Sequence, residues 1–179
     1  MRQDIERILF SEEQLQTRIA ELGAQITEDF RDKEPLFVGV LKGCFVFMAD
    51  LCRRIDLPCT IDFMSVSSYG AGTSSSGQVE IKKDISCSIE GYHVIIVEDI
   101  LDSGNTLHSL MGVLQARHPA SIRICTLLDK PERRVKDVNV DYTCFNIPDE
   151  FVVGYGLDYA QRYRNLPFIG IVEFENEQE

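Results

Sequence analysis

Long apolar segments are missing from this sequence. It contains no tryptophan, and its longest uninterrupted apolar run is short, from Cys44 to Ala49. A helix that spans a bilayer needs about 20 apolar residues, so we expect no membrane segment. Residues 1–6 (MRQDIE) carry no apolar signal region either. These absences favour a cytoplasmic protein without a membrane partner.

Positive charge is also scarce. The chain has 18 Lys and Arg against 29 Asp and Glu, which gives a formal net charge of −11. Sequence-independent binding to DNA or RNA requires a basic face, so we expect no nucleic-acid partner. A small polyanionic substrate is compatible with this charge if a few well-placed cations, or a metal ion, help to bind it.

Several common chemical motifs are absent. The six cysteines form no CxxC pair, and they show no zinc spacing with the three histidines. Most cysteines lie in apolar runs, which is typical of small buried side chains in a reducing compartment. No GxxxxGK[ST] motif occurs, and Gly154-Tyr155-Gly156 lacks the third glycine of a dinucleotide fingerprint.

The patterns that are present predict one domain, residues 1–179, with alternating strands and helices. Ser11 and Gln14 form a capping box before an apolar stripe that starts at Leu15. A further helix is predicted from Phe45 to Ile55, and Leu107 to Leu114 mark another. Strands are predicted at 36–40, 60–66, 79–81, 94–97, 122–127, 140–145, 151–153 and 168–172.

This alternation predicts an α/β fold with a mainly parallel central sheet and helices on both faces. The β-branched run Val94–Val97 is typical of a strand that is covered on both sides. In such sheets, ligands bind beyond the carboxyl ends of the strands. The loop that follows Val97 is therefore the first place to look for a site.

That loop combines two acids with a small polar turn. Glu98 and Asp99 end the strand, and residues 102–106 (Asp-Ser-Gly-Asn-Thr) precede a helix. Backbone amides at the positive end of a helix can bind a phosphate, and Ser103 and Thr106 can add hydroxyl donors. An ordinary turn capped by Asp or Ser would use the same residues. Two poorly hydrated carboxylates repel each other, which favours a polyhydroxyl ligand or a metal as their partner.

The run from Val94 to Thr106 resembles the phosphoribosyl-pyrophosphate signature of the type I phosphoribosyltransferases. Further matching segments are Lys42-Gly43, Ser68-Tyr69, Lys130 and residues 151–159. With these, the whole chain resembles the bacterial hypoxanthine (hypoxanthine-guanine) phosphoribosyltransferases. The resemblance implies Mg²⁺-dependent transfer of ribose 5-phosphate from phosphoribosyl pyrophosphate to N9 of a 6-oxopurine, hypoxanthine or guanine, in purine salvage. The products would be IMP or GMP and pyrophosphate.

The resemblance also assigns roles at the sugar-phosphate end. The turn formed by Asp102, Ser103, Gly104, Asn105 and Thr106 would bind the 5′-phosphate, and Asp102 would also be the general base near purine N7. An alternative role for Asp102 is to cap the helix. Glu98 and Asp99 would face the ribose hydroxyls and their magnesium shell.

At the pyrophosphate end, the resemblance implies a non-proline cis peptide at the turn of Lys42 and Gly43, whose backbone would contact pyrophosphate. Arg164 would bind the same group. Read without the resemblance, Lys42 is a surface lysine and Arg164 one solvated charge among several.

For the purine, the resemblance implies that Lys130 donates to the 6-oxo group and that Phe151 stacks on the base. The Val152 backbone would read the base edge. Asp158 would take part in base binding and, with Glu98 and Asp99, in holding magnesium. Residues 151–153 could equally be an ordinary core strand.

The remaining expectations concern larger features. Residues 67–78 are predicted to be a flexible lid hairpin led by Ser68 and Tyr69, and the N-terminal segment with residues 145–179 a small hood. The resemblance implies a dimer or tetramer. Arg133 and Arg134 are interpreted as part of a solvated loop.

Three alternatives stay open at this point. Xanthine could be preferred over hypoxanthine or guanine, because the residues around C2 contribute mostly backbone. The chain could be a regulatory module that binds nucleotides and controls RNA or DNA, although it lacks a basic face. It could also bind sugar phosphates without turnover.

Overall fold

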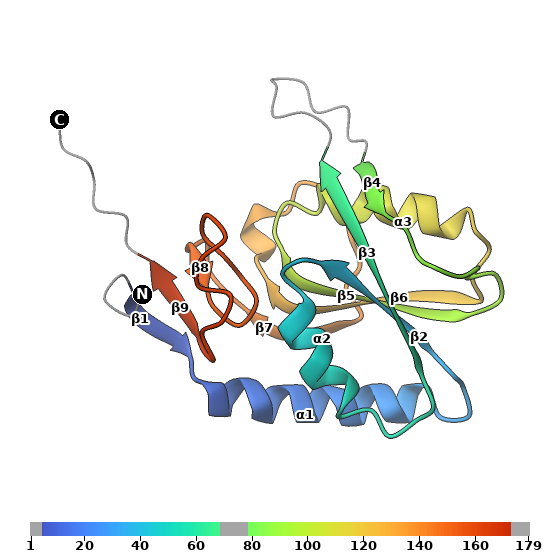
Figure 1. The fold of residues 1–179 in the computed structure, drawn as a ribbon, viewed down its shortest axis with the longest axis horizontal. Coiled ribbons are helices and arrows are strands. Elements are labelled where there is room, and N and C mark those ends of the chain that lie inside the picture. The colour runs from blue at the N-terminus through green and yellow to red at the C-terminus, as the bar shows by residue number, and fades with distance from the viewer. Residues whose placement is uncertain (1–4, 69–78, 173–179) are drawn as a thin grey trace.

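The computed structural model describes residues 5–68 and 79–172, and its centre is a six-stranded sheet (Figure 1). The strand order is β4-β3-β2-β5-β6-β7. All neighbouring pairs are parallel except β3 and β4, which are antiparallel. The strands are β2 (Leu36–Leu41), β3 (Thr60–Ser68), β4 (Val79–Lys83), β5 (His93–Leu101), β6 (Ser121–Asp129) and β7 (Tyr142–Asn146).

Helices cover both faces of this sheet. Helices α1 (Glu12–Asp29) and α2 (Phe45–Cys52) pack on the face that carries Ile95 and Val97. Helix α3 (Asn105–Gln115) packs on the opposite face, against Val94 and Ile96. Alternate residues of β5 therefore point into two different cores, and all four are fully buried. The predicted α/β architecture is confirmed.

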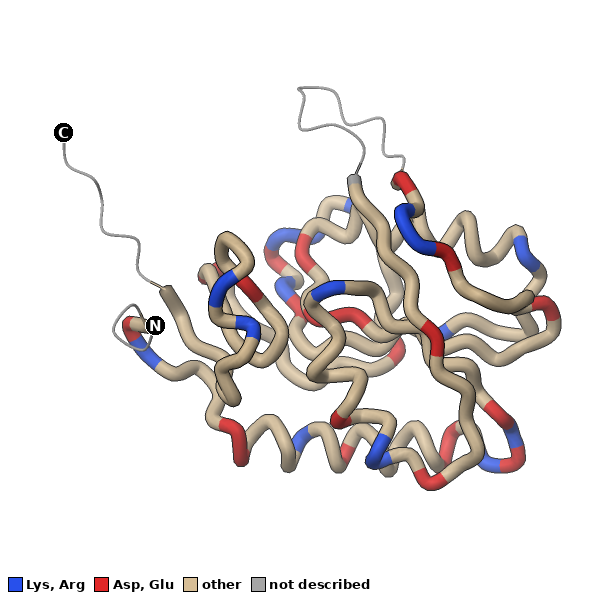
Figure 2. The backbone as a smooth tube through the Cα atoms, viewed as in Figure 1, with Lys and Arg blue, Asp and Glu red and all other residues tan. Residues whose placement is uncertain are grey.

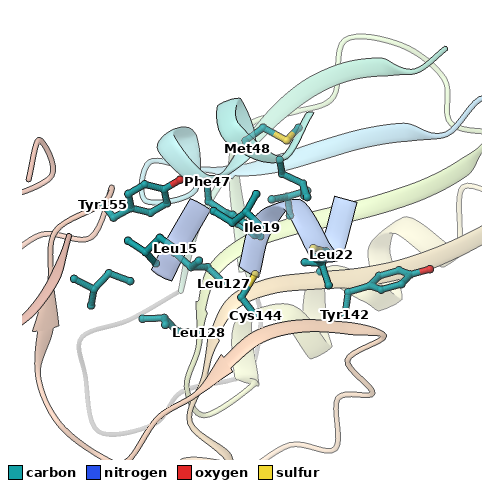
Figure 3. Close-up of a cluster of buried hydrophobic side chains, with 14 of the residues drawn as sticks. Leu15, Ile19, Leu22, Phe47, Met48, Leu127, Leu128, Tyr142, Cys144 and Tyr155 are labelled. Atoms are coloured by element: carbon teal, nitrogen blue, oxygen red, sulfur yellow. The ribbon is translucent and has the colours of Figure 1, made fainter. Parts of the chain in front are cut away.

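The larger core lies beneath α1 and α2 (Figure 3). Both halves of the predicted capping box are formed: Gln14 N donates to Ser11 Oγ, and the Gln14 side chain accepts from the Ser11 amide. The predicted stripe is buried on this helix, at Leu15, Ile19, Leu22 and Ile26. Helix α2 was predicted to reach Ile55 but ends at Cys52, because residues 53–56 turn toward Pro58 and the start of β3.

A second, three-stranded sheet stands beside the main one (Figure 1). Strand β9 (Ile169–Val172) pairs antiparallel with both β1 (Ile5–Phe10) and β8 (Val152–Val153). The N-terminal segment and the C-terminal part, from which a hood was expected, thus share one sheet. Strand β1 was not predicted, because its charged residues Glu6 and Arg7 break the apolar alternation.

Charges of both signs are interleaved along the described chain (Figure 2). Among the described residues, no helix has the length and apolar character needed to cross a membrane.

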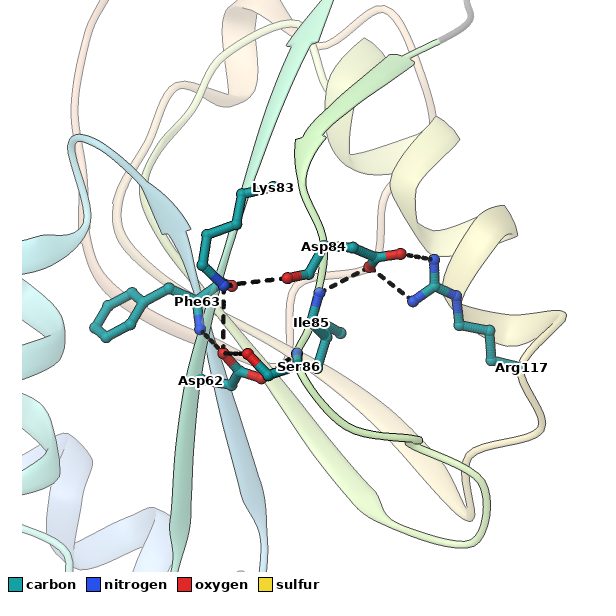
Figure 4. A network of polar contacts seen from close by, with 7 residues as sticks. All are labelled: Asp62, Phe63, Lys83, Asp84, Ile85, Ser86 and Arg117. Carbon is teal, nitrogen blue, oxygen red and sulfur yellow. Dashed lines mark hydrogen bonds and ion pairs between the residues drawn. The ribbon is translucent and has the colours of Figure 1, made fainter.

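A polar network ties the edge strand β4 to its neighbours (Figure 4). Arg117, just after α3, donates to both carboxylate oxygens of Asp84, each at 2.8 Å. Lys83 Nζ donates to the carbonyl oxygen of Phe63, and Asp62 accepts from the amide of Ser86 at 2.6 Å. This network connects β4 to β3 and to the end of α3, and residues 69–78 lie outside the described part of the chain. Tyr69 of the predicted lid falls among them.

Candidate active site

The predicted site residues gather at the carboxyl ends of the parallel strands. Two adjoining cavities lie there, of about 560 Å³ and about 140 Å³, and both are lined by Ile100 and Asp102. The larger cavity also reaches Lys130 and Phe151, and the smaller one reaches Ser103 and Thr106. The edge of the sheet that the parallel topology singled out therefore carries two cavities that share lining residues.

The turn of residues 102–106 leads from β5 into α3. Gly104 is the N-cap of the helix and has φ of 82°, and the amide of Asn105 donates to Ser103 Oγ at 3.4 Å. A Cβ at Gly104 would lie 3.0 Å from the carbonyl oxygen of Lys136, so both the conformation and the space favour glycine. The prediction that Asp102 could cap the helix is wrong. Gly104, Thr106 and Leu107, at the start of α3, line the smaller cavity, at the positive end of the helix dipole.

Glu98 and Asp99 lie together at the end of β5. Loss of hydration raises the pKa of Glu98 well above its ordinary value, and the adjacent charge of Asp99 raises it further. Loss of hydration also raises the pKa of Asp99, against hydrogen bonds from Glu98 and from the amide of Ile100. Two negative charges at this point of the strand are therefore unfavourable unless a cation or hydrogen-bond donors face them.

The turn of Lys42 and Gly43 lies against Asp99. The peptide bond between Leu41 and Lys42 is cis, as the resemblance implied. A Cβ on Gly43 would lie only 1.6 Å from Asp99 Oδ2, and one on Gly156 would lie 2.2 Å from the Gly43 carbonyl oxygen. The turn is thus packed between β5 and the segment around Gly156, and no side chain fits at Gly43.

Arg164 joins that segment to the turn. Its Nη1 donates to the Gly156 carbonyl oxygen at 2.8 Å, and its Nη2 lies 2.8 Å from Asp158 Oδ1. Gln161 Oε1 accepts from both Arg164 Nη2 and Lys42 Nζ, each at 3.4 Å. Lys42 and Arg164, far apart in the sequence, therefore lie on one side of the site. Gln161 was missed because no sequence pattern marks a single glutamine that bridges two cations.

The larger cavity has one buried cation. The Lys130 side chain is 8% exposed, and its Nζ lies 3.6 Å from Asp149 Oδ1. Phe151 is partly exposed and meets Tyr159 edge-to-face, with ring centroids 5.6 Å apart. Residues 152–153 form the buried strand β8, and Val152 also lines the cavity. The two interpretations of this segment are compatible.

The interpretation of Arg133 and Arg134 as a solvated loop holds for Arg133, which is 49% exposed, but is wrong for Arg134. Arg133 Nε lies 2.6 Å from Asp102 Oδ1, and its Nη1 donates to Asp149 at 3.1 Å. Arg134 is mostly buried and forms an ion pair with Asp129. Sequence reasoning missed Arg133 and Asp149 as lining residues, because a charge in a polar stretch gives no sign of what it will contact.

The three acids predicted to hold metal are not brought together as one cluster. Asp99 and Asp158 line the larger cavity, whereas Glu98 lines the smaller one. In the described part of the chain, no three His, Cys, Asp or Glu side chains form a group that could hold a metal by themselves. Ser68, of the predicted lid, is the last residue of β3.

Comparison with known proteins agrees with this geometry. The phosphoribosyl transferase domain family matches residues 9–160. The hypoxanthine-guanine phosphoribosyltransferase of Bacillus subtilis is 53% identical over 173 residues, which cover 97% of this chain and 96% of that protein. The Streptococcus pyogenes enzyme of the same name is 52% identical, over 98% of this chain and 97% of its own.

Two solved structures that match this chain are also hypoxanthine phosphoribosyltransferases. A crystal structure of a Staphylococcus aureus hypoxanthine phosphoribosyltransferase has a TM-score of 0.94 at 52% identity, covering 97% of this chain and 94% of that one. A Bacillus anthracis hypoxanthine-guanine phosphoribosyltransferase has a TM-score of 0.91 at 53% identity, covering 94% and 99%. Sequence, fold and site agree, and the chain belongs to the hypoxanthine-guanine phosphoribosyltransferases, transferases of the phosphoribosyltransferase family.

Proposed function

We propose that this protein transfers ribose 5-phosphate from phosphoribosyl pyrophosphate to N9 of hypoxanthine or guanine, releasing pyrophosphate. The observation that carries the proposal is that two neighbouring cavities share the lining residues Ile100 and Asp102. A helix N-terminus suited to a phosphate opens directly into a space that contains a buried lysine and an aromatic ring. A nucleoside monophosphate has matching groups, with a phosphate at one end and a purine base at the other.

At the sugar-phosphate end, residues 102–106 hold the 5′-phosphate. The amides of the first turn of α3 and the hydroxyls of Ser103 and Thr106 donate to its oxygens. Glu98 and Asp99 face the ribose hydroxyls. As the bond from C1 to pyrophosphate lengthens, the sugar gains positive charge, and nearby carboxylate charge stabilises it.

At the pyrophosphate end, Lys42 and Arg164 supply the cations. Their common contact with Gln161 keeps them on the same side of the site. Arg164 has a planar fork that suits two phosphate oxygens at once, and the backbone of Gly43 adds donors without a side chain in the way.

At the purine end, Lys130 donates to the 6-oxo group and Phe151 stacks on the ring. A buried donor that meets the 6-amino group of adenine would be left unpaired, which can give discrimination of about 10⁴-fold. The Val152 backbone reads the base edge. Asp102 accepts the proton near N7, a step that typically contributes about 10²–10⁴-fold.

Magnesium fits the donors that are present. Asp99 and Asp158 offer oxygen ligands on one cavity, and Mg²⁺ commonly binds through one or two carboxylates while substrate phosphates and water complete its shell. Glu98 would join them through the shared hydrogen bond with Asp99. The ion would neutralise pyrophosphate charge in a protein that is itself acidic. A small set of carboxylates is consistent with a metal that arrives with the substrate.

Two finer features complete the proposal. Ser68 and Tyr69 lead a lid that keeps water from the reactive sugar. The protein forms a homodimer or tetramer, as the resemblance implies. Sedimentation of the purified protein measures the assembly directly.

The experiment that tests the reaction is a product assay. The protein is mixed with Mg²⁺ and phosphoribosyl pyrophosphate, and hypoxanthine, guanine, xanthine or adenine is added separately. We expect nucleoside monophosphate from hypoxanthine and guanine but not from adenine, and the xanthine arm ranks the third 6-oxopurine. Product with adenine would contradict the role of Lys130. Binding of phosphoribosyl pyrophosphate without product from any base would favour a binding or regulatory protein.

Metal removal tests the magnesium role separately. We expect activity to disappear in EDTA and to return with excess Mg²⁺. Full turnover in EDTA would contradict the metal-dependent scheme and leave the base-recognition result unaffected.

A further inference from the structure

We infer that Arg133 and Asp149 are positioning residues that hold Asp102 and Lys130 in place around the purine cavity. The inference rests on the proposed transfer reaction, in which Asp102 and Lys130 contact the purine base. It concerns a charge chain of four side chains, Asp102–Arg133–Asp149–Lys130, which we call the bridge. All four line the larger cavity.

The contacts of the bridge are ion pairs between successive members. Arg133 Nε lies 2.6 Å from Asp102 Oδ1, and Nη1 lies 3.1 and 3.2 Å from the two oxygens of Asp149. Asp149 Oδ1 in turn lies 3.6 Å from Lys130 Nζ. The proposed base and the proposed 6-oxo donor are thus connected through one guanidinium and one carboxylate.

The backbone under Arg133 is fixed on both sides. Pro131 opens a 3-10 turn, and the amide of Arg133 donates to the Lys130 carbonyl oxygen at 3.1 Å. Beyond the turn, the amides of Val135 and Lys136 both donate to the Ser103 carbonyl oxygen, at 2.9 and 3.1 Å. The segment is therefore attached to the phosphate turn itself, and the Arg133 fork is carried with it.

Arginine suits this place because its planar fork can reach two carboxylates in different directions at once. A lysine is a point charge and can satisfy only one of them well. The ion pairs themselves add little to stability, because Arg133 and Asp149 are each 49% exposed and exposed pairs contribute at most about 1 kcal/mol. The effect of the bridge is therefore expected in catalysis and not in the free energy of unfolding.

The test compares Arg133→Met, Arg133→Lys and Arg123→Met. Arg123 is the matched control: it is 51% exposed and pairs with Asp141 at 3.0 Å, outside both cavities of the site. For Arg133→Met we expect kcat to fall about 10- to 100-fold, because misplacement of a reacting group by about 1 Å can cost 10²-fold. KM for phosphoribosyl pyrophosphate and the thermal midpoint should stay unchanged. Arg133→Lys should recover part of the loss, and Arg123→Met should equal wild type.

A second arm asks whether the bridge acts as a unit. Asp149→Asn removes the carboxylate beside Lys130, so we expect KM for the purine base to rise. For the double variant Arg133→Met, Asp149→Asn, the loss in kcat/KM for the purine base should be smaller than the product of the two single losses. Both substitutions break the same bridge, so their effects are not independent. Multiplicative losses would show independent roles and overturn the inference. So would wild-type kcat in Arg133→Met, or a kcat loss that only follows a lower thermal midpoint. Absence of transfer by the wild-type protein would instead contradict the proposed function.

Discussion

The two ends of the site are built in different ways. The proposed phosphate turn is one continuous segment, residues 102–106, whose shape comes from Gly104 and the start of α3. The proposed pyrophosphate side joins Gly43 to the distant segment of Gly156 and Arg164, and its tightest contact is between Gly43 and Asp99. Local backbone can hold a phosphate, whereas the placement of cations depends on how three segments pack.

This difference predicts where substitutions should act. A change in the phosphate turn should affect the chemistry of one group and leave the remaining contacts intact. A change in the packed segments should disturb several groups together. The following variants test that distinction, from the largest expected effect to the smallest.

Asp102→Asn tests the local end. Asparagine keeps the size of the side chain but cannot accept the proton near N7, so we expect kcat to fall about 10²–10⁴-fold. Binding of phosphoribosyl pyrophosphate should change much less, because backbone amides and hydroxyls carry it. Steady-state kinetics with titration calorimetry measures both, and unchanged turnover would remove Asp102 as the base.

Gly43→Ala tests the assembled end. The new Cβ would lie 1.6 Å from Asp99 Oδ2, so the turn or the carboxylate must move. We expect kcat/KM for phosphoribosyl pyrophosphate to fall about 10²-fold, as for a misplacement of about 1 Å. Wild-type kinetics in this variant would show that the packing at Gly43 does not position the site.

The control for this substitution is Gly112→Ala. Gly112 lies in α3 with no atom within 4 Å of an added Cβ. Alanine there should raise the free energy of unfolding by up to about 1 kcal/mol and leave activity unchanged.

Tyr155→Phe tests how the assembled end is anchored. The buried Tyr155 hydroxyl donates to Asp50 on α2 and lies 3.4 Å from Gln16 Nε2. Removal of a buried hydrogen bond to a charged group should lower the free energy of unfolding by about 1–3 kcal/mol. We also expect KM for phosphoribosyl pyrophosphate to rise, because Tyr155 adjoins Gly156.

Tyr142→Phe is its matched partner. Tyr142 is equally buried and donates to Asp29 at 2.7 Å, away from both cavities. Chemical denaturation should give similar losses of stability for the two variants, with changed kinetics only for Tyr155→Phe. Equal kinetics in both would mean that the anchor serves stability alone.

Asp84→Asn lies outside both ends and should have the smallest effect. The Arg117 hydrogen bond lowers the pKa of Asp84 in the folded protein, so its contribution to stability is present above the ordinary carboxyl pKa. That contribution is lost as the pH falls through the lowered pKa. Because the pair is partly exposed, we expect a loss below about 1 kcal/mol at neutral pH. Thermal unfolding should show the difference at pH 7 and none in strong acid.

Much of the fold could be predicted because its signals are local. The Ser11 capping box predicts the start of a helix, and the β-branched run Val94–Val97 predicts a buried strand, each from neighbouring residues alone. Strand β1 could not be predicted, since Ile5–Phe10 forms a strand only because β9 offers it hydrogen bonds. For the site, the 102–106 turn was visible in the sequence, but the bridge through Arg133 was not.

The sequence by itself determined the α/β alternation, the phosphate turn and the family, because periodicity, glycine and short motifs act over a few residues. Only the tertiary structure decided that Gly43 must lack a side chain beside Asp99, that Gln161 joins Lys42 to Arg164, and that Arg133 contacts Asp102. Apart from the hydrogen bond between Gln161 and Arg164, these contacts join residues that lie from about 30 to more than 100 positions apart in the chain. Their geometry follows from the packing of whole elements, which no local pattern encodes.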